Sequence, residues 1–367
     1  MLNLGETIKK ARRARDLTQE QLAEYLNLSI SAVSQWESGR TMPDITAIPS
    51  ICNLLGISAD TLLGIDLARR EEKIKSIRDE AGRYSGRGYY DEARSLLEGG
   101  LGEFPDSYEL MNDLMFVAYW QRQERNEACL DEAIRLGEAI LAGCTEDTIR
   151  HSAIQILCYS YTDRGEIERA KALARKMPIL CIAQEGLMAY IEQGTAGYRA
   201  IQEEIDSLLQ TLTVRLGCMN VKLDDDSSAY TPAELAALND KRLALFALMF
   251  EDGDYGFYHT HLCDIHREQA AYFAKIGDAA GTLHHLTAAA DHAINFMQWA
   301  EQGCAPRTSL IFRGNKGYTS FGTGDTDNDA ARVLRQIGQP PFAFACDTPE
   351  AAAIRERLAP YAGKWTV

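Results

Sequence analysis

Two short helical patterns separated by a turn signal, within residues 18–39, limit most strongly what this chain can fold into. The segment reads TQEQLAEYLNLSISAVSQWESG. Thr18 and Gln21 form a capping-box pair before the first helix, and Asn27 suits the left-handed residue that ends it. Ser29 is placed to cap the second helix, and Gly39 to end it. Helices this short are unstable alone, so they must pack against further helices.

The apolar residues of this segment recur at helical spacing and define an inward and an outward side. The inward positions are Leu22, Ala23, Leu26, Val33 and Trp36. The outward positions of the second helix are Ile30, Ser31, Ser34 and Gln35. Two helices joined by a tight turn and braced by neighbours form a helix-turn-helix, whose second helix can enter the major groove of DNA.

Residues 4–64 resemble the Cro/repressor-type helix-turn-helix module, often called the XRE family. The resemblance rests on the segments 18–23, 29–33 and 35–40, on Pro43, and on Gly56–Ser58 and Leu62–Gly64. It implies that Gln19 contacts a phosphate, that Ile30, Ser31, Ser34 and Gln35 face base edges, and that Ser38 and Arg40 hold the DNA backbone. The alternative is a module that has lost DNA binding and mediates only protein contacts.

The residue types on the outward face indicate which bases it can read. Gln35 can bind adenine through two hydrogen bonds, and Ile30 can meet a thymine methyl group. No arginine belongs to this face, so a strong preference for guanine is not expected. Pro49 departs from the commonest pattern of the family, because it falls inside the expected fourth helix. A proline there lacks a backbone donor and should kink or delay that helix.

The charge of the chain restricts how it can meet DNA. The formal net charge is −15, from 38 basic and 53 acidic side chains. Residues 1–66 hold 6 basic and 8 acidic side chains, a net charge of −2, so the rest of the chain carries −13. A protein that coats nucleic acid is basic over its surface. The sequence therefore favours a local reader of DNA over a nonspecific coat.

Composition narrows the class further. Hydrophobic residues make up 46% of the chain, a value typical of globular domains. No apolar run approaches the roughly 18 residues of a membrane span, and the N-terminal residues lack the pattern of a signal peptide. The nine cysteines are scattered and never spaced C-x-x-C, which argues against a disulfide framework and a zinc ribbon. We expect a cytoplasmic protein that contacts no membrane.

The long remainder shows helical pairs that repeat with a period of about 34 residues. Units beginning at Ile77, Ile154 and His266 place small and large residues at matching offsets. This pattern resembles the tetratricopeptide repeat. We expect an all-α fold with a helix-turn-helix domain at residues 1–66, a linking helix at 67–80, an α-solenoid at 81–300, and a C-terminal loop with capping helices at 301–367.

A solenoid of this kind forms a concave surface that binds peptides or helices. The repeat register places polar and aromatic side chains of the first helix of each pair on that surface, where they can clamp a ligand. The candidates are Arg78, Asn112, Phe116, Tyr119, Gln155, Tyr159 and Arg267. The alternative for each is a solvated position or one buried within the stack.

Other candidate sites have weaker support. His259, Cys263 and His266 share one helical face and are weak metal candidates, with helix packing as the favoured interpretation. The sequence DTDND at residues 325–329 opens like a calcium loop but lacks the glycine and the acidic residue that complete one. RGNKG and FGTGD lack the context of a phosphate loop. No catalytic signature is present, so we expect neither an enzyme nor a cofactor.

A helix-turn-helix followed by a tetratricopeptide-like solenoid resembles the peptide-sensing regulators of Gram-positive bacteria. That resemblance implies that the solenoid binds a short signalling peptide, forms a homodimer and repositions two heads on double-stranded DNA. We therefore expect a DNA-binding transcriptional regulator that senses a peptide or another ligand. The alternatives are a protein-interaction scaffold that the head targets to DNA, and a metal-responsive repressor that uses the histidines.

Overall fold

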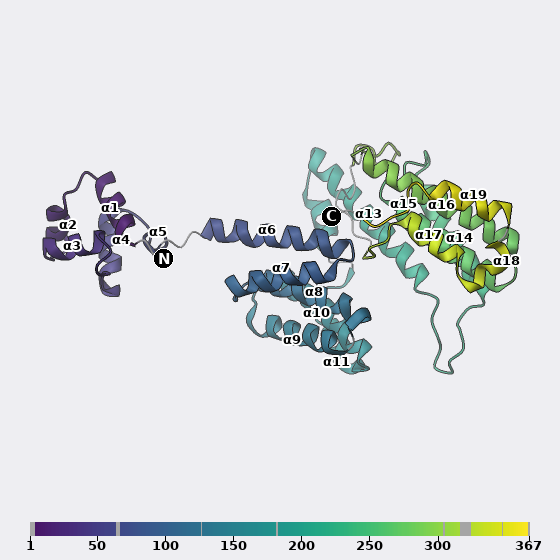
Figure 1. Ribbon diagram of the computed structural model, residues 1–367, viewed down its shortest axis with the longest axis horizontal. Coiled ribbons are helices and arrows are strands. Elements are labelled where there is room, and N and C mark those ends of the chain that lie inside the picture. The colour runs from purple at the N-terminus through teal and green to yellow at the C-terminus, as the bar shows by residue number, and fades with distance from the viewer. Residues whose placement is uncertain are drawn as a thin grey trace. The chain divides into compact units, whose positions relative to one another are not determined.

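The computed structural model confirms an all-α chain with a helix-turn-helix head and a body of helical hairpins (Figure 1). It describes residues 4–63, 67–125, 127–180, 183–303, 305–315, 324–346 and 348–365. Within these ranges there is no strand, and only two isolated antiparallel bridges form. The chain divides into two compact units, Met1–Asp79 with Gly102–Ser107 and Glu80–Leu101 with Tyr108–Val367. The domain boundaries at residues 66 and 300 remain predictions.

The head consists of short helices packed around one apolar core. Its elements are α1 (Leu4–Ala14), α2 (Gln19–Tyr25), α3 (Ile30–Glu37), η1 (Ile45–Ala47), α4 (Ile48–Leu55) and α5 (Ala59–Leu63). Each of the five α-helices contributes to the core, which comprises Leu4, Ile8, Leu22, Ala23, Val33, Trp36, Ile51, Leu55 and Leu62. The predicted inward stripes of α2 and α3 are thereby confirmed, except that Leu26 is only half-buried.

The predicted turn chemistry of the head is also present. Thr18 and Gln21 form a complete capping box at α2, and the hydroxyl of Ser29 accepts a hydrogen bond from the Ala32 amide at the start of α3. Asn27 and Gly39 both have positive φ values, of 55° and 72°. The fourth helix is delayed, as predicted, since α4 begins only at Ile48. Pro49 then lies in the first turn of α4, where a proline removes no intrahelical hydrogen bond.

The linking helix and the first hairpins follow the head. They are α6 (Leu67–Gly86), α7 (Tyr90–Glu103), α8 (Tyr108–Arg125), α9 (Glu127–Gly143), α10 (Asp147–Asp163) and α11 (Ile167–Ala174). Small residues let the hairpins nest closely. At Gly137 of α9, an added Cβ would lie 2.7 Å from side-chain atoms of Met115 on α8 and Leu157 on α10. The predicted alternation of small and large residues therefore sets the spacing of this stack.

The C-terminal part of the body departs from regular repeats. Its elements are α12 (Gln184–Ile191), α13 (Gly194–Gly217), α14 (Pro232–Met249), α15 (Tyr258–Lys275), α16 (Ala279–Glu301), α17 (Asp329–Ile337), η3 (Pro340–Phe342), α18 (Ala343–Cys346) and α19 (Pro349–Leu358). Helix α13 has 24 residues and leads into an extended loop before α14 (Figure 1). Helices α17 and α19 pack against α16, and their role as capping helices remains a prediction.

The contact between α15 and α16 contains a row of histidines. The Nδ1 atoms of His259 and His292 lie 2.8 Å apart, and those of His266 and His285 lie 2.9 Å apart. The rings of His266 and His292 stack with centroids 5.5 Å apart, so the four rings form one continuous row. In each Nδ1 pair one ring must donate and the other accept, which requires at least one neutral imidazole.

Burial keeps this histidine row neutral. Desolvation, with the neighbouring histidines, lowers the pKa of His259 and of His266 to about 3, and desolvation lowers the pKa of His292 to about 4. An unfolded chain has the ordinary histidine pKa, so below about pH 6.5 it takes up protons that the folded chain refuses. The free energy of unfolding is therefore undiminished above about pH 6.5, and it decreases as the pH falls toward the folded-state pKa values of the histidines.

We therefore predict that α15 and α16 become less stable between pH 7 and pH 5. Each of these three histidines should lower the free energy of unfolding by up to about 1.4 kcal/mol per pH unit near pH 5, and by less than that between pH 7 and pH 6, where the unfolded histidine is only partly protonated. Hydrogen exchange resolved on α15 and α16 measures this slope. The double variant His259→Gln/His292→Gln should flatten it, whereas His151→Gln, on α10, should leave it unchanged. A wild-type slope that persists in the double variant would contradict the assignment.

Candidate DNA-binding head and ligand-binding face

Helix α3 presents the predicted reading face to solvent. Ile30, Ser31, Ser34 and Gln35 are all exposed, and Ile30 exposes 48% of its surface. On the opposite side Val33 and Trp36 are buried in the head core, which fixes the rotation of the helix about its axis. The four side chains thus project together from one side of a short, anchored helix, the geometry that readout in a major groove requires.

A single carboxylate at the end of α3 joins the first three helices. Glu37 accepts hydrogen bonds from Arg12 Nε at 2.6 Å and Arg12 Nη2 at 2.9 Å, a bidentate pair between α3 and α1. Gln19 Nε2, at the start of α2, donates to the same carboxylate at 2.8 Å. Arg12 Nη1 also donates to the carbonyl oxygen of Leu17 at 2.6 Å. Both charged side chains are more than nine-tenths buried.

The electrostatics of this pair follow from its geometry. Burial acts to raise the pKa of Glu37, but the hydrogen bonds from Arg12 and Gln19 outweigh it, and its pKa lies below the ordinary value. The hydrogen bond to Glu37 raises the pKa of Arg12, against the opposing effect of burial. Both groups stay charged, and the charge of each compensates the buried charge of the other. The sequence pattern predicts no buried ion pair between Arg12 and Glu37, which lie 25 positions apart.

The remaining predicted DNA contacts lie around α3. The side-chain amide of Gln19 is already bonded to Glu37, so its second N–H is the group available for a phosphate. Ser38 is exposed, and its hydroxyl donates to the carbonyl oxygen of Gln35 at 3.1 Å. Arg40 is exposed beyond the end of α3, and its backbone N–H donates to the same carbonyl. The roles of all these residues in DNA binding remain predictions.

In the body, four of the predicted ligand residues meet on α8 and α10. Tyr119 and Tyr159 have ring centroids 5.8 Å apart, and Gln155 Nε2 donates to the Tyr159 hydroxyl at 2.9 Å. Phe116 lies on the same side of α8, and Trp120 joins the set, with its ring 6.0 Å from Phe116 and 5.4 Å from Tyr119. We call Phe116, Tyr119, Trp120, Gln155 and Tyr159 the aromatic face.

The aromatic face combines open rings with an anchored one. Phe116, Trp120 and Tyr159 expose 42%, 38% and 40% of their surfaces, and together they form a contiguous exposed aromatic patch. Tyr119 is 6% exposed, and its hydroxyl donates to Asp163 at 3.0 Å, which holds the ring in place. The repeat register did not include Trp120, although its position four residues after Phe116 placed it on the same side of the helix.

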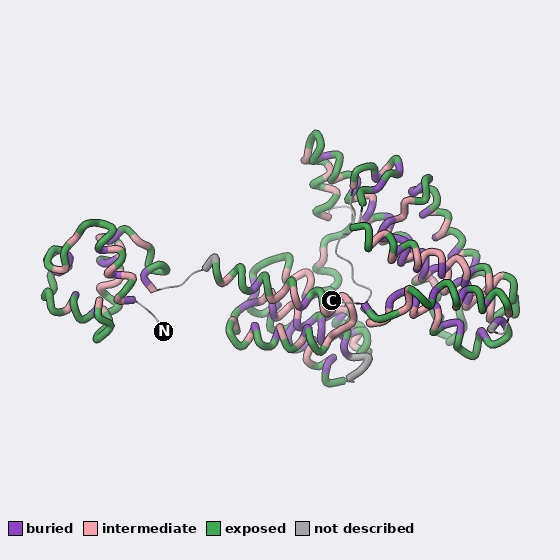
Figure 2. The backbone as a smooth tube through the Cα atoms, turned by 45° about the horizontal axis from the view of Figure 1, so that its top comes forward, coloured by how far each residue is buried: buried purple, intermediate pink, exposed green. Residues whose placement is uncertain are grey.

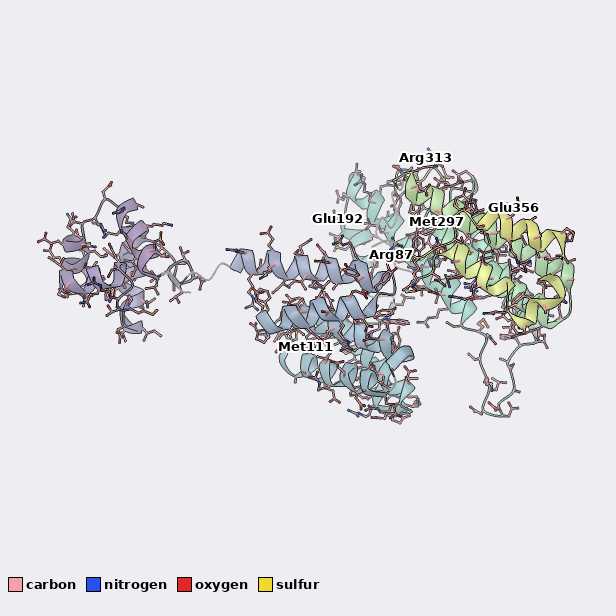
Figure 3. The ribbon with its side chains drawn as sticks, viewed as in Figure 1. Arg87, Met111, Glu192, Met297, Arg313 and Glu356 are labelled. Carbon is pink, nitrogen blue, oxygen red and sulfur yellow. The ribbon has the colours of Figure 1, made fainter. Side chains whose placement is uncertain are left out.

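The other predicted ligand residues are placed differently. Asn112 lies one turn before Phe116 on α8, near Met111 (Figure 3), and its buried Oδ1 atom has no hydrogen-bond donor. Arg78 is half-buried on α6, in the other compact unit. The guanidinium of Arg267 pairs with Asp264 and donates to Gln336 on α17, so it takes part in the packing of the body. Their roles in ligand binding also remain predictions.

A hollow of about 320 Å³ lies between α9, α10 and α11. Its lining residues are Glu138, Leu141, Leu157, Tyr161, Arg169, Ala172 and Leu173. Its polar groups satisfy one another, because Glu138 accepts a hydrogen bond from Tyr161 at 2.7 Å and from Arg169 at 2.7 Å. Desolvation and the Glu138 carboxylate raise the pKa of Tyr161 to about 12. These groups present no unmet hydrogen bond to a ligand.

The weak metal candidates do not form a metal site. His259 and His266 bond to histidines of α16 rather than to Cys263, whose fully buried thiol packs in an apolar cluster. Two nitrogens bound to one tetrahedral zinc stand roughly 3.3 Å apart, given Zn–N bonds of about 2.0 Å, whereas these pairs are direct hydrogen bonds. Across the described residues, no group of three or more potential ligands converges on one point.

The acidic sequence at residues 325–329 is neutralised by arginines. Asp325 pairs with Arg335 at 3.2 Å and Asp327 also pairs with Arg335, while Asn328 caps α17. These carboxylates therefore have cationic partners within the fold. The glycine-rich sequences RGNKG and FGTGD lie partly outside the described residues. In the described part of the chain, no helix has the length and hydropathy of a membrane span.

Comparison with known families identifies the head. Residues 8–62 match the family model described as helix-turn-helix, and this range covers the capped helices α2 and α3. The head is a helix-turn-helix domain. The match confirms the fold expected from the turn at Asn27, and it extends over the core residues that hold α3 in place.

Relatives of the chain are an activator and a repressor by name. The chain is 36% identical over 76 residues to the HTH-type transcriptional activator BcrR of Enterococcus faecalis, covering 20% of this chain and 37% of that protein. It is 35% identical over 72 residues to the immunity repressor protein of Bacillus phage phi105, covering 20% of this chain and 50% of the relative. The chain thus spans half or less of the length of these relatives.

Among solved structures, the chain is similar to the crystal structure of Bacillus thuringiensis PlcR in complex with the peptide PapR7 and DNA. The sequences are 17% identical, and the match covers 82% of this chain and 99% of that one. The TM-score is 0.31. A score this low carries no argument about shape or function, so the functional inference depends on the residues of the head and body.

We predict that Glu37→Ala destabilises the head by roughly 3–5 kcal/mol, because it leaves the Arg12 guanidinium buried without its partner. Hydrogen exchange on α1 and α3 of the full chain measures the change. Glu20→Ala, which removes an exposed carboxylate from α2, is the matched control and should have little effect. Arg12→Met combined with Glu37→Leu should recover most of the loss. Equal effects of the Glu37 and Glu20 variants would contradict the prediction.

Proposed function

We propose that this protein is a transcriptional regulator that reads double-stranded DNA with α3 and senses a ligand with its helical body. The observation that carries the proposal is the exposed face of Ile30, Ser31, Ser34 and Gln35 on a helix whose other side is anchored in the core. The named relatives are an activator and a repressor, and neither name is that of an enzyme.

The aromatic face supports a short peptide as the ligand. Its half-exposed rings offer apolar contact area, and Gln155 and Tyr159 offer hydrogen-bonding groups beside them. Extended peptides bind such surfaces through backbone hydrogen bonds and through pockets for apolar side chains.

An apolar stripe on α13 supports a homodimer. Tyr198, Ile201, Leu208 and Leu212 expose between 45% and 49% of their surfaces, and their spacing places them on one side of the helix. Helix α12, which is followed by its C-cap residue Glu192 (Figure 3), packs on α13, and none of its side chains is buried. The burial colouring of the chain is shown in Figure 2. Leu187, Tyr190 and Ile191 enlarge the exposed apolar area.

A second copy of this chain is the occupant that we propose for the α13 stripe. The four stripe residues carry no charge, so the surface can pair with itself across a two-fold axis. Two bodies that each carry a strong negative charge would repel one another through any charged surface. A dimer also explains how a small head gains affinity, since two reading helices about 34 Å apart meet successive major grooves.

The first experiment is selection from a pool of random duplex DNA with purified full-length protein. Wild type should enrich a half-site that is repeated about one helical turn apart. The variant Ser34→Ala/Gln35→Ala should lose the enrichment, because it removes two of the side chains that face the bases. Phe344→Ala, an exposed change in the body away from α12 and α13, is the control and should enrich the same sequence. Failure of the wild type to enrich any sequence would refute DNA reading by α3.

The same selection tests the dimer surface. Leu208→Glu/Leu212→Glu places charges on the stripe without emptying the core, since both positions are exposed. This variant should sediment as a monomer and enrich single half-sites. A dimer that survives these changes would exclude the α13 stripe as the surface that pairs two copies.

For the aromatic face, the probe is a phage-displayed library of random peptides selected on the immobilised protein. We expect wild type to enrich peptides with apolar side chains. The variant Phe116→Ala/Tyr159→Ala should lower recovery of the enriched peptides at least tenfold, since losing about 1.4 kcal/mol of contact energy changes affinity tenfold. Phe344→Ala removes an exposed aromatic ring elsewhere in the body and should not change recovery. Equal recovery with both variants would show that the peptides bind another surface.

A further inference from the structure

The basic residues of the head are concentrated away from the recognition helix. Helix α3 contains no lysine or arginine, and five of the six basic residues in positions 1–66 lie between Lys9 and Arg15. DNA binding requires cations that neutralise phosphates. Arg40 alone follows α3, so most of the positive charge that this head can offer to DNA comes from α1 and the residue after it.

Two of these five residues are occupied within the head. Arg12 is buried against Glu37, and Arg15 Nη1 donates to the carbonyl oxygen of Leu54 at 3.0 Å. Lys10 lies 3.6 Å from Glu6 on the same helix, which partly offsets its charge. Within the described residues Lys9 and Arg13 make no ion pair, so their charges remain available.

Lys9 and Arg13 border a hollow of about 400 Å³ between α1 and the end of the recognition helix. The hollow is lined by Gly5, Glu6, Lys9, Lys10, Arg13, Glu37, Ser38 and Gly39. The carboxylate of Glu37 is bonded to Arg12, whose charge offsets it, and to Gln19, and it also attracts the charge of Lys9. The hollow is then bordered by the two cations Lys9 and Arg13, by the Glu6 carboxylate that faces Lys10, and by the Ser38 hydroxyl, which donates to Gln35.

Close packing holds the two walls of this hollow together. A Cβ added at Gly5 would lie 2.0 Å from the carbonyl oxygen of Trp36, so α1 touches the last turn of α3 at a distance that only glycine permits. The Arg12–Glu37 pair spans the same two helices. The cations of α1 therefore keep a fixed position beside the residues that leave the recognition helix.

We propose that Lys9 and Arg13 bind a phosphate of the DNA backbone in this hollow, beside the C-terminal end of the recognition helix. A helix in the major groove has a sugar-phosphate backbone on each side, and contacts to these phosphates set its register. The proposal rests on the proposed reading of DNA by α3. It adds a second anchoring point at α1, beyond the contacts expected from Gln19, Ser38 and Arg40.

The test is the salt dependence of binding to the selected operator. Dissociation constants are measured against KCl concentration for wild type and for the single variants Lys9→Gln, Arg13→Gln and Arg15→Gln. Each of the first two should weaken binding roughly tenfold and reduce the slope of log Kd against log [KCl] by about 0.9. Sequence preference should not change, because a phosphate contact reads no base. Arg15→Gln removes one charge elsewhere and should leave the slope unchanged.

The outcomes separate this proposal from the one on which it rests. If wild type selects no operator, DNA reading itself is refuted. If wild type binds its operator and the Lys9 and Arg13 variants keep the wild-type slope, α1 does not bind phosphate and the further proposal is overturned. Circular dichroism and thermal unfolding of each variant must match wild type, to show that the variants fold normally. We expect this match, because Lys9 is half-buried and Arg13 and Arg15 are exposed.

Discussion

The carboxylate of Glu37 is the group on which the position of the recognition helix depends. It receives hydrogen bonds from Arg12 of α1 and from Gln19 of α2, so three helices meet at one buried charge. Apolar packing by Val33 and Trp36 fixes which side of α3 faces outward. The ion pair adds a directional restraint at its C-terminal end, next to Ser38 and Gly39. Reading face and proposed phosphate site therefore share one rigid support.

The head was largely predictable because its signals are local. Capping by Thr18 and Ser29 and the positive φ of Asn27 each depend on residues within a few positions of one another. The apolar period then assigned the buried and exposed sides of α2 and α3. The Arg12–Glu37 pair was missed because it joins residues 25 positions apart, and no short-range pattern distinguishes a buried arginine from its exposed neighbours on a basic helix.

The body was predictable in class but less so in detail. Repeat spacing placed Phe116, Tyr119, Gln155 and Tyr159 on one surface, since each helical pair repeats the same register. Trp120 and the histidine row depend on how adjacent helices rotate against each other, which nonlocal packing decides. The packing of Arg267 was likewise not predictable from local sequence, because its partner Gln336 lies 69 residues away. The α13 stripe is recognised only in the structure, where its residues are exposed among the described residues.

Charge connects the parts into one mechanism. The acidic body repels DNA, so affinity must come from the few cations of the head, and each phosphate contact adds only a limited, salt-sensitive amount. One head with so few cations should therefore hold an operator weakly. Joining two heads makes the second binding event intramolecular and raises affinity without any new contact. In the proposed regulator, a ligand on the aromatic face would control DNA binding without touching the head, provided that it binds more tightly to one arrangement of the paired bodies than to another.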